Sequence, residues 1–291
     1  MIKPNFFIVG QTRSGTTSLL YWLQQHPDVF IIHSGTGKIL SLFGFPPNSN
    51  EEEYLKNFSG VKDEKSIGEK CTDNLLNPDA AQKIYRFNPE GKIIISLRNP
   101  IDVMYSVFTS NLYRDTTEKL TSFAEALQIE NTRELESKKN PGKYSPFLFY
   151  RKIARYVEQI RRYQNLFDQK NIHFVIFDDL VKKPEYVFSQ ICRFLDIDST
   201  LKLSLAPKNQ IRRTRSNSIQ LLVNKMHNTK IRRLASKIPK IQDTYLILNR
   251  PKFERPPIDL ILKKHLCEEL KPEIDELSKL IGRDLSYWYQ S

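Results

Sequence analysis

The chain has 291 residues, of which 40% are hydrophobic and 27% charged, a balance that suits a globular protein with a large buried core. It contains no apolar run near the ~20 residues of a membrane-spanning helix, and the apolar run that follows Met1 is too short for a signal peptide. The three cysteines are widely spaced and odd in number. We therefore expect a cytoplasmic protein with neither a disulfide framework nor a metal site.

The net charge of +12 is concentrated in one segment, residues 199–242, which has eleven basic residues and no acidic one. The rest of the chain is close to neutral. Such a segment predicts an anionic partner: a nucleotide, an anionic acceptor, nucleic acid or a membrane surface. For the later basic residues, from Lys225 to Lys240, a solvated helix face is an equal alternative.

Short apolar runs rich in β-branched residues predict four buried strands, at 6–9, 30–32, 92–97 and 173–177. Helical patterns lie between and after them, at 16–25, 77–87, 101–113, from Ser122, at 147–167 and at 184–195. This alternation predicts an α/β fold with a P-loop-like central parallel sheet flanked by helices and a helical C-terminal third. The ligand should lie at the carboxyl ends of the strands.

The loop after the first strand reads GQTRSGTT (residues 10–17) and has the spacing of the nucleoside-triphosphate loop GxxxxGK[ST], except that Thr16 replaces the lysine. Its glycines permit a tight turn, so that several amides and the positive end of the next helix face one anionic group. Triphosphate hydrolases use the missing lysine together with Mg²⁺. Here Arg13 can offer a forked cationic contact instead.

The stretch FIVGQTRSGTTSLLYWLQQHPDVF resembles the 5′-phosphosulfate loop of sulfotransferases that use 3′-phosphoadenosine-5′-phosphosulfate (PAPS), in the carbohydrate (heparan-sulfate-like) and bacterial branches. Those families often have a lysine where Arg13 stands. The resemblance implies that PAPS is the donor, that 3′-phosphoadenosine-5′-phosphate (PAP) leaves, and that the 5′ side is bound by Arg13, Ser14, Gly15, Thr16, Thr17 and Ser18.

Three further stretches extend the resemblance. Arg98 in the sequence LRNP, with Ser106 eight residues later, resembles the family's 3′-phosphate element, which implies that both bind that group. Residues 177–195 and 277–288 resemble its strand–Pro–helix unit and its closing Gly-Arg-Asp-Leu-x-x-Trp. In the basic segment, the pattern around Arg215 and Ser216 resembles a bacterial lid, which implies another arginine on the 3′-phosphate.

The catalytic base is the least determined part of the site. Carbohydrate sulfotransferases usually carry a glutamate after the second strand, and that position is Ile39 here. A base should lie in line with the sulfur, so His33, Asp73 and Glu69 remain as candidates. The segment from Glu69 to Thr72 resembles the family's Glu-Lys-[Ser/Thr]-Pro element, which implies that Lys70 faces the sulfate and stabilises charge that develops on the transferred group. Because Glu69 and Lys70 are adjacent on a predicted strand, they should face opposite sides, which makes Glu69 a supporting residue.

We therefore expect one sulfotransferase domain over 1–291, with an α/β nucleotide-binding core (1–198), a basic lid segment (199–242) and a C-terminal helical part (243–291). The expected reaction is metal-independent, in-line transfer of a sulfuryl group to a hydroxyl or amine of a carbohydrate or small polar metabolite, possibly an anionic one. A P-loop kinase or triphosphatase is the alternative. Nucleic-acid binding is disfavoured because residues 199–242 contain no aromatic side chain. The acceptor and the oligomeric state stay open.

Overall fold

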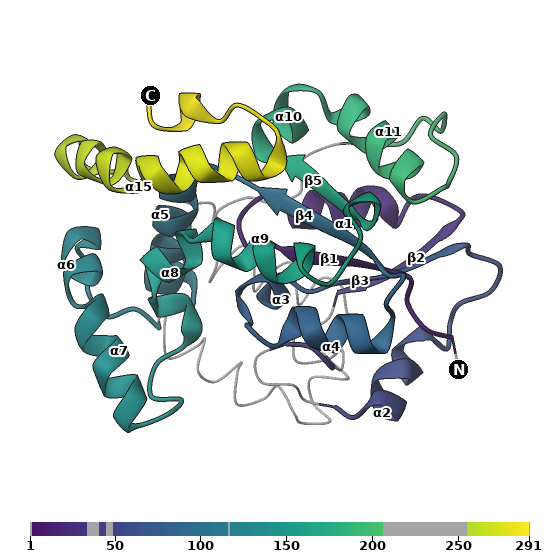
Figure 1. The fold of residues 1–291 in the computed structure, drawn as a ribbon, viewed down its shortest axis with the longest axis horizontal. Coiled ribbons are helices and arrows are strands. Elements are labelled where there is room, and N and C mark those ends of the chain that lie inside the picture. Colours follow the sequence, from purple (N-terminus) through teal and green to yellow (C-terminus); the bar gives the residue numbers. More distant parts are fainter. Residues whose placement is uncertain (1, 34–40, 45–48, 116, 206–254, 291) are drawn as a thin grey trace, which may run out of the picture. The chain divides into compact units, whose positions relative to one another are not determined.

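The computed structural model describes residues 2–33, 41–44, 49–115, 117–205 and 255–290 (Figure 1). Several predicted features fall outside these ranges: Ile39, the lid residues Arg215 and Ser216, and the basic run from Lys225 to Lys240. Within them, no helix is long and apolar enough to cross a bilayer.

Five parallel strands form one sheet in the order β2-β3-β1-β4-β5. The strands are β1 (Phe6–Gly10), β2 (Val29–His33), β3 (Ser66–Lys70), β4 (Lys92–Leu97) and β5 (Ile172–Ile176). The central strand β1 is buried along its whole length, as expected of a parallel sheet covered on both faces. The predicted α/β class with a parallel sheet is confirmed.

Strand β3 has a weak apolar signal because its sequence is SIGEK. Gly68 is needed there: a Cβ atom at this position would lie 2.1 Å from the Phe6 ring on β1. The glycine leaves space for that ring, which belongs to the core formed with Leu19, Trp22 and Ile191.

Helices follow most of the strands. They are α1 (Thr16–Leu23), α2 (Glu51–Leu55), α3 (Asp73–Leu76), α4 (Ala80–Phe87), α5 (Pro100–Ser110), α6 (Phe123–Gln128), α7 (Glu130–Lys139), α8 (Tyr150–Ala154), α9 (Tyr156–Gln164), α10 (Phe177–Lys182), α11 (Pro184–Phe194) and α15 (Leu260–Ile281). A π-helical turn (Asn111–Asp115) follows α5, and short 3-10 turns lie at Lys56–Phe58, Pro146–Leu148, Gln169–Asn171 and Ser286–Trp288. The C-terminal residues that are described are largely helical, as predicted.

The single helix predicted over 147–167 is wrong. It is split into a 3-10 turn, α8 and α9, with Arg155 in a non-helical conformation (ψ 75°). The carbonyl of Ile153 accepts a hydrogen bond from the Gln11 side chain (2.9 Å) rather than from the amide four residues later. That amide, on Val157, donates to the Glu273 carboxylate (2.8 Å). Two distant side chains thus satisfy the groups that a continuous helix would pair.

The predicted helix at 77–87 is also shorter than expected. Pro78 lies outside it, and α4 begins at Ala80. The Asn77 side chain instead donates to the carbonyl of Phe43 (2.8 Å) and accepts from the amide of Asp79 (3.1 Å), which holds a turn before the helix.

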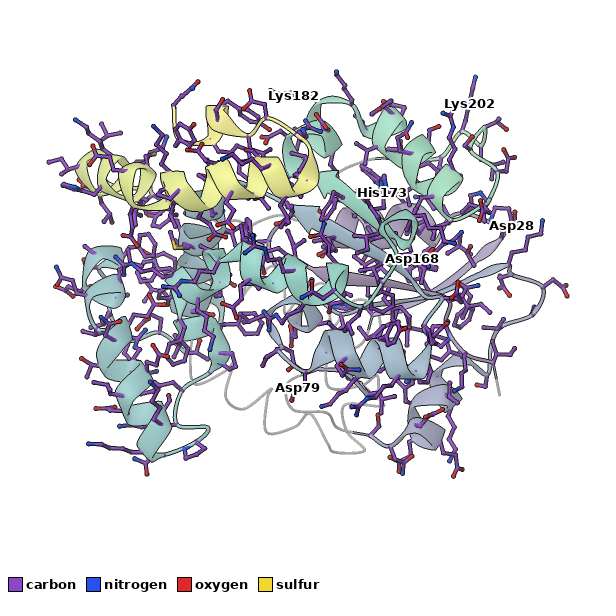
Figure 2. The ribbon with its side chains drawn as sticks, in the orientation of Figure 1. Asp28, Asp79, Asp168, His173, Lys182 and Lys202 are labelled. Carbon is purple, nitrogen blue, oxygen red and sulfur yellow. The ribbon has the colours of Figure 1, made fainter. Side chains whose placement is uncertain are left out.

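The chain forms two compact units, and each unit is built from more than one stretch of the sequence. Unit 1 comprises Met1–Val103, Ile153–Asn209 and Leu266–Ser291 and contains the sheet. Exposed charged side chains of this unit, such as Asp79 and Lys202, are labelled in Figure 2. Unit 2 comprises Met104–Lys152 and Gln210–His265. The predicted division at residues 198 and 242 stays a prediction.

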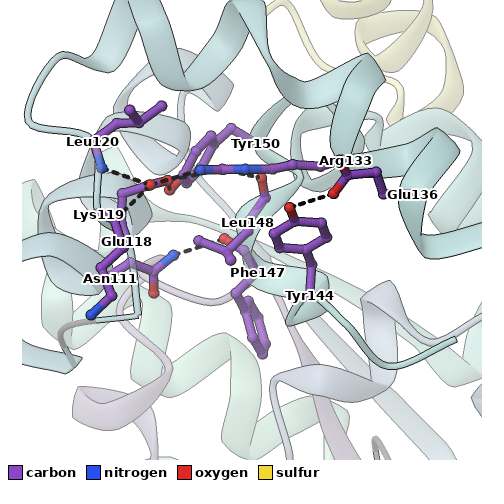
Figure 3. A network of polar contacts seen from close by, with 10 residues as sticks. All are labelled: Asn111, Glu118, Lys119, Leu120, Arg133, Glu136, Tyr144, Phe147, Leu148 and Tyr150. Atoms are coloured by element: carbon purple, nitrogen blue, oxygen red, sulfur yellow. Dashed lines mark hydrogen bonds and ion pairs between the residues drawn. The ribbon is translucent and has the colours of Figure 1, made fainter. Parts of the chain in front are cut away.

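Unit 2 contains a buried polar network around Glu118 (Figure 3). Both carboxylate oxygens of Glu118 accept from the Arg133 guanidinium (2.7 and 2.9 Å), and one also accepts from the Tyr150 hydroxyl (2.7 Å). The amides of Lys119 and Leu120 complete its partners. The carboxylate is fully buried and well satisfied.

Candidate active site at the carboxyl ends of the strands

The strands are parallel, so their carboxyl ends share one edge of the sheet in unit 1. Most of the predicted site residues lie at this edge or directly after it: 13–18 after β1, His33 at the end of β2, Lys70 at the end of β3, and Arg98 after β4. Ser106 lies in α5 within unit 2. One set of the predicted residues therefore lies at one edge of the sheet.

The loop after β1 has an unusual backbone. Arg13 (φ 64°) and Gly15 (φ 82°) are both in the left-handed region, which is uncommon for a residue other than glycine. A Cβ atom on Gly15 would lie 3.1 Å from the Leu180 side chain, and one on Gly10 would lie 2.6 Å from the Cβ of Leu75. Both glycines therefore permit close packing as well as the turn.

The same loop is fixed from several sides. The Gln11 side chain accepts from the amide of Thr12 (2.7 Å) and donates to Ile153 and to Gln159. The Ser96 hydroxyl donates to the carbonyl of Ser14. The Ser14 hydroxyl itself is fully buried and has no hydrogen-bond partner in the described part of the chain. A buried hydroxyl without a partner at a helix start fits a site that an anion completes.

The Arg98 side chain is positioned by three elements. Its Nη2 lies 3.0 Å from Asp102, its Nη1 donates to the carbonyl of Arg13 (3.4 Å), and its Cζ lies 4.6 Å from the centre of the Phe177 ring. Asp102 is half exposed, so this ion pair is weak and can yield to a stronger anion. The Arg98 Nε is buried without a hydrogen-bond partner among the described residues. A guanidinium with a free donor fits a phosphate.

The closing C-terminal segment supports the Arg98 turn. The Asn99 side chain donates to the carbonyl of Trp288 (2.7 Å), and the Trp288 indole donates to Asp178 (2.9 Å). Arg283 forms an ion pair with Asp179. The Gly-Arg-Asp-Leu-x-x-Trp stretch therefore joins the turn after β4 to helix α10, which follows β5, a role that its sequence alone did not reveal.

Lys70 and His33 form a pair on neighbouring strands, where they lie in register. The Lys70 Nζ lies 2.9 Å from the His33 Nε2. Burial lowers the pKa of Lys70 to about 8, and burial together with the Lys70 charge lowers the pKa of His33 to about 4. At neutral pH the imidazole is therefore neutral and accepts a hydrogen bond from the ammonium group.

Glu69 is separated from this pair. Its carboxylate is fully buried and accepts a hydrogen bond from the Tyr54 hydroxyl (2.6 Å), whereas Lys70 contacts His33. Adjacent strand residues point to opposite faces, which accounts for the separation. Burial and the Glu69 charge raise the pKa of Tyr54 well above its usual value, so Tyr54 stays a donor.

Asp73 is the first residue of α3 and lies three residues after Lys70. Burial raises the pKa of its carboxyl, and the Lys70 charge lowers it in part. Among the described residues, the one hydrogen bond to its carboxylate comes from the Thr72 hydroxyl, at 3.5 Å. The next side chain, Asn74, is buried and has no partner there for either amide atom. The sequence patterns gave no signal for Asn74.

The residues at this edge fit a nucleotide with anionic groups at two positions. The loop after β1 offers a buried, unpaired hydroxyl at the start of α1, and the turn after β4 offers a guanidinium with a free donor. Within the described ranges, no group of three or more His, Cys, Asp or Glu side chains is arranged to hold a metal ion.

Comparisons with known proteins agree with this arrangement. The sequence matches the Sulfotransferase domain family over residues 3–238. It is 23% identical over 280 residues to the membrane-associated sulfotransferase kil1 of Dictyostelium discoideum. It is 28% identical over 203 residues to a bifunctional heparan sulfate N-deacetylase/N-sulfotransferase of Caenorhabditis briggsae. These matches cover 72% and 67% of this chain but 59% and 23% of the relatives, so the chain spans only part of their length.

The fold also matches a solved structure. The sulfotransferase from Alicyclobacillus acidocaldarius aligns with a TM-score of 0.72 and 26% identity, over 99% of both chains. Together with the family match over most of the sequence, this similarity shows that the chain belongs to the sulfotransferase domain family of enzymes.

Proposed function

We propose that the protein transfers a sulfuryl group from PAPS to a hydroxyl or amine of a carbohydrate or small polar metabolite, without a metal. The observation that supports this most strongly is the pair of anion-binding elements on the neighbouring strands β1 and β4, each with an unpaired buried donor. The loop from Arg13 to Ser18 would hold the 5′-phosphosulfate, and Arg98 would hold the 3′-phosphate. PAPS supplies the activated sulfuryl group when bound.

Lys70 would act on the transferred group. Its ammonium is buried, and its hydrogen bond is to a neutral imidazole. The Asp73 charge raises the pKa of Lys70 only in part, because burial outweighs it. A desolvated cation of this kind stabilises negative charge more strongly than an exposed one. Bound sulfate oxygens would in turn raise the pKa of Lys70 and keep it protonated.

Asp73 is the base that we favour among the three candidates. Its carboxyl has a raised pKa and only a long hydrogen bond from Thr72. His33 is weaker because its Nε2 already accepts from Lys70 and its pKa is about 4. Glu69 is held by Tyr54 away from this pair. A carboxylate with a raised pKa can remove the acceptor proton as the new S–O or S–N bond forms.

The donor assignment is tested by ligand binding. We expect PAP without Mg²⁺ to raise the melting temperature, because a ligand that binds only the folded state stabilises it by mass action. ATP with Mg²⁺ should give a smaller shift. Stabilisation by ATP–Mg²⁺ with no effect of PAP would contradict the proposal and favour the kinase alternative.

The base assignment is tested by Asp73→Asn, His33→Gln and Glu69→Gln, assayed with labelled PAPS against a panel of sugars and amines. We expect Asp73→Asn to lower turnover by about 100-fold, within the range for loss of a general base, while the Kd for PAP stays unchanged. His33→Gln and Glu69→Gln serve as matched controls at the same strand ends. A larger loss of turnover in either control than in Asp73→Asn would overturn the assignment.

A further inference from the structure

One face of α9 carries three buried polar side chains, Tyr156, Gln159 and Tyr163. Their spacing of three and four residues places them in a row along the helix. A buried helix face is ordinarily apolar, so three polar groups in a row need partners. The partners lie far away in the sequence.

Each of the three contacts the segment that follows a different strand; after β3 this segment includes the start of α3. The Tyr156 hydroxyl donates to the carbonyl of Arg98 after β4 (3.0 Å). Gln159 accepts from the side chain of Gln11 after β1 (3.3 Å). The Tyr163 hydroxyl donates to the carbonyl of Asn74 after β3 (2.8 Å).

The order of these contacts follows the sheet. Strands β3, β1 and β4 are neighbours in that order, and Tyr163, Gln159 and Tyr156 contact their loops in the same order. The helix is part of unit 1, as are all three loops and the sheet (Figure 1). One rigid element therefore links the three loops that carry the candidate site residues.

We infer that α9 is a positioning element, in which the Tyr156 hydroxyl sets the Arg98 turn for the donor and the Tyr163 hydroxyl sets the start of α3 for the acceptor side. The inference rests on the proposed function, because it assigns the two loops to donor and acceptor. Neither tyrosine is a catalytic residue, since each acts through a backbone carbonyl. Burial raises the pKa of both tyrosines well above the usual value, so both hydroxyls stay protonated and donate.

The inference predicts that Tyr156→Phe and Tyr163→Phe differ in their effect on the affinity for PAP. Tyr156→Phe removes one hydroxyl from the donor turn, and we expect it to raise the Kd for PAP about fivefold to tenfold, as loss of a hydrogen bond of ordinary strength would. Tyr163→Phe should leave the Kd for PAP within about twofold of wild type, because its partner lies on the acceptor side. Both are measured by isothermal titration calorimetry with PAP.

Hydrogen exchange of the ligand-free protein gives a second readout. Tyr156→Phe should speed amide exchange in the peptide over 96–103, and Tyr163→Phe in the peptide over 70–77. Tyr85→Phe is the matched control, because the Tyr85 ring packs against Phe167 and its hydroxyl has no recorded partner among the described residues. It should change neither the exchange of these peptides nor the Kd.

Gln159→Met tests the middle contact. It should raise the Kd for PAP in the same direction as Tyr156→Phe, because Gln159 holds the loop after β1 through Gln11. If Tyr156→Phe does not fold, this variant still tests whether α9 positions the loops for donor binding.

The outcomes separate the inference from the proposed function. If wild type does not bind PAP, the proposed function fails. The hydrogen-exchange data alone then show whether the Tyr156 and Tyr163 hydroxyls hold the Arg98 turn and the start of α3. If wild type binds PAP but both tyrosine variants weaken it equally, or neither differs from Tyr85→Phe, then α9 only packs against the sheet and the inference is overturned.

Discussion

At the scale of single residues, the site holds a buried cation beside a neutral base. Lys70 and His33 lie in register on neighbouring strands, and burial together with the Lys70 charge lowers the pKa of His33. Such a pair is costly in the absence of a ligand, and an anion at Lys70 would relieve the cost. The pair is thus suited to a site that binds sulfate oxygens.

The pH dependence of PAPS binding tests this view. Lys70 has a pKa of about 8 in the free protein, so it loses its charge as pH rises through that value. We expect the affinity for PAPS, measured by calorimetry, to fall above about pH 8 and to be level below it until other groups titrate. PAP lacks the sulfuryl group, so its affinity should depend less on Lys70.

Lys70→Arg supplies the control for that experiment, because a guanidinium stays charged over this range. The fall in PAPS affinity near pH 8 should disappear in this variant, even if its affinity is lower overall. A fall of the same size in Lys70→Arg would assign the titration to another group and contradict the role of Lys70.

The sequence indicates which residues lie at the site better than it indicates what each one does. Arg13, Arg98 and Lys70 could be placed because each lies at or just after the end of a strand in a recognisable pattern. The choice of base could not, since it depends on the hydrogen bond from Lys70 to His33 and on the contact of Glu69 with Tyr54. Those contacts join residues from different elements, which no local pattern encodes.

At the scale of elements, local signals located strands well and helix breaks badly. The four apolar runs match β1, β2, β4 and β5 to within a few residues. The division between α8 and α9 was missed because it depends on Gln11 and Glu273, which are distant in sequence. Amphipathic spacing continues through the break and gives no sign of it. The consequence is functional, because the break starts the helix that contacts three site loops.

Unit 2 contains the buried polar network around Glu118, which joins residues from different elements. Burial alone would raise the pKa of Glu118, but hydrogen bonds from Arg133, Leu120, Tyr150 and Lys119 lower it below its usual value. Glu118→Gln would leave the buried Arg133 charge uncompensated. We expect a loss of about 3 kcal/mol or more in the free energy of unfolding at neutral pH, measured by urea denaturation.

The matched control is Glu136→Gln, which changes a carboxylate that also contacts a tyrosine but is more than one third exposed. It should cost at most about 1 kcal/mol. The carboxylate of Glu118 stabilises the fold above its unfolded pKa, and this contribution disappears as pH falls through its lowered folded pKa. The gap between wild type and Glu118→Gln should therefore narrow in acid. A constant gap would show that charge is not the cause.

At the scale of the whole molecule, most of the excess positive charge and the proposed anion-binding residues lie in different parts of the sequence. Nearly all of the excess charge lies in residues 199–242, whereas Arg13 and Arg98, which we propose bind anions, follow strands β1 and β4 of the sheet. The family pattern gives a specific role only to Arg215 and Ser216 at the start of this segment. For the later lysines we expect only long-range attraction of an anionic ligand.

These two kinds of contribution differ in their response to salt. We expect Arg215→Ala to raise the Kd for PAP about tenfold at physiological salt, because a charge-assisted hydrogen bond to phosphate resists screening. If these lysines act only at long range, a variant with Lys225, Lys230, Lys237 and Lys240 all changed to Gln should match wild type there, because charges separated by more than about 8 Å are largely screened at physiological salt. It should bind PAP more weakly than wild type only when salt is lowered. A loss for the lysine variant that persists at high salt would instead mean that these lysines contact the nucleotide, and the donor site would have to include the later part of the basic segment.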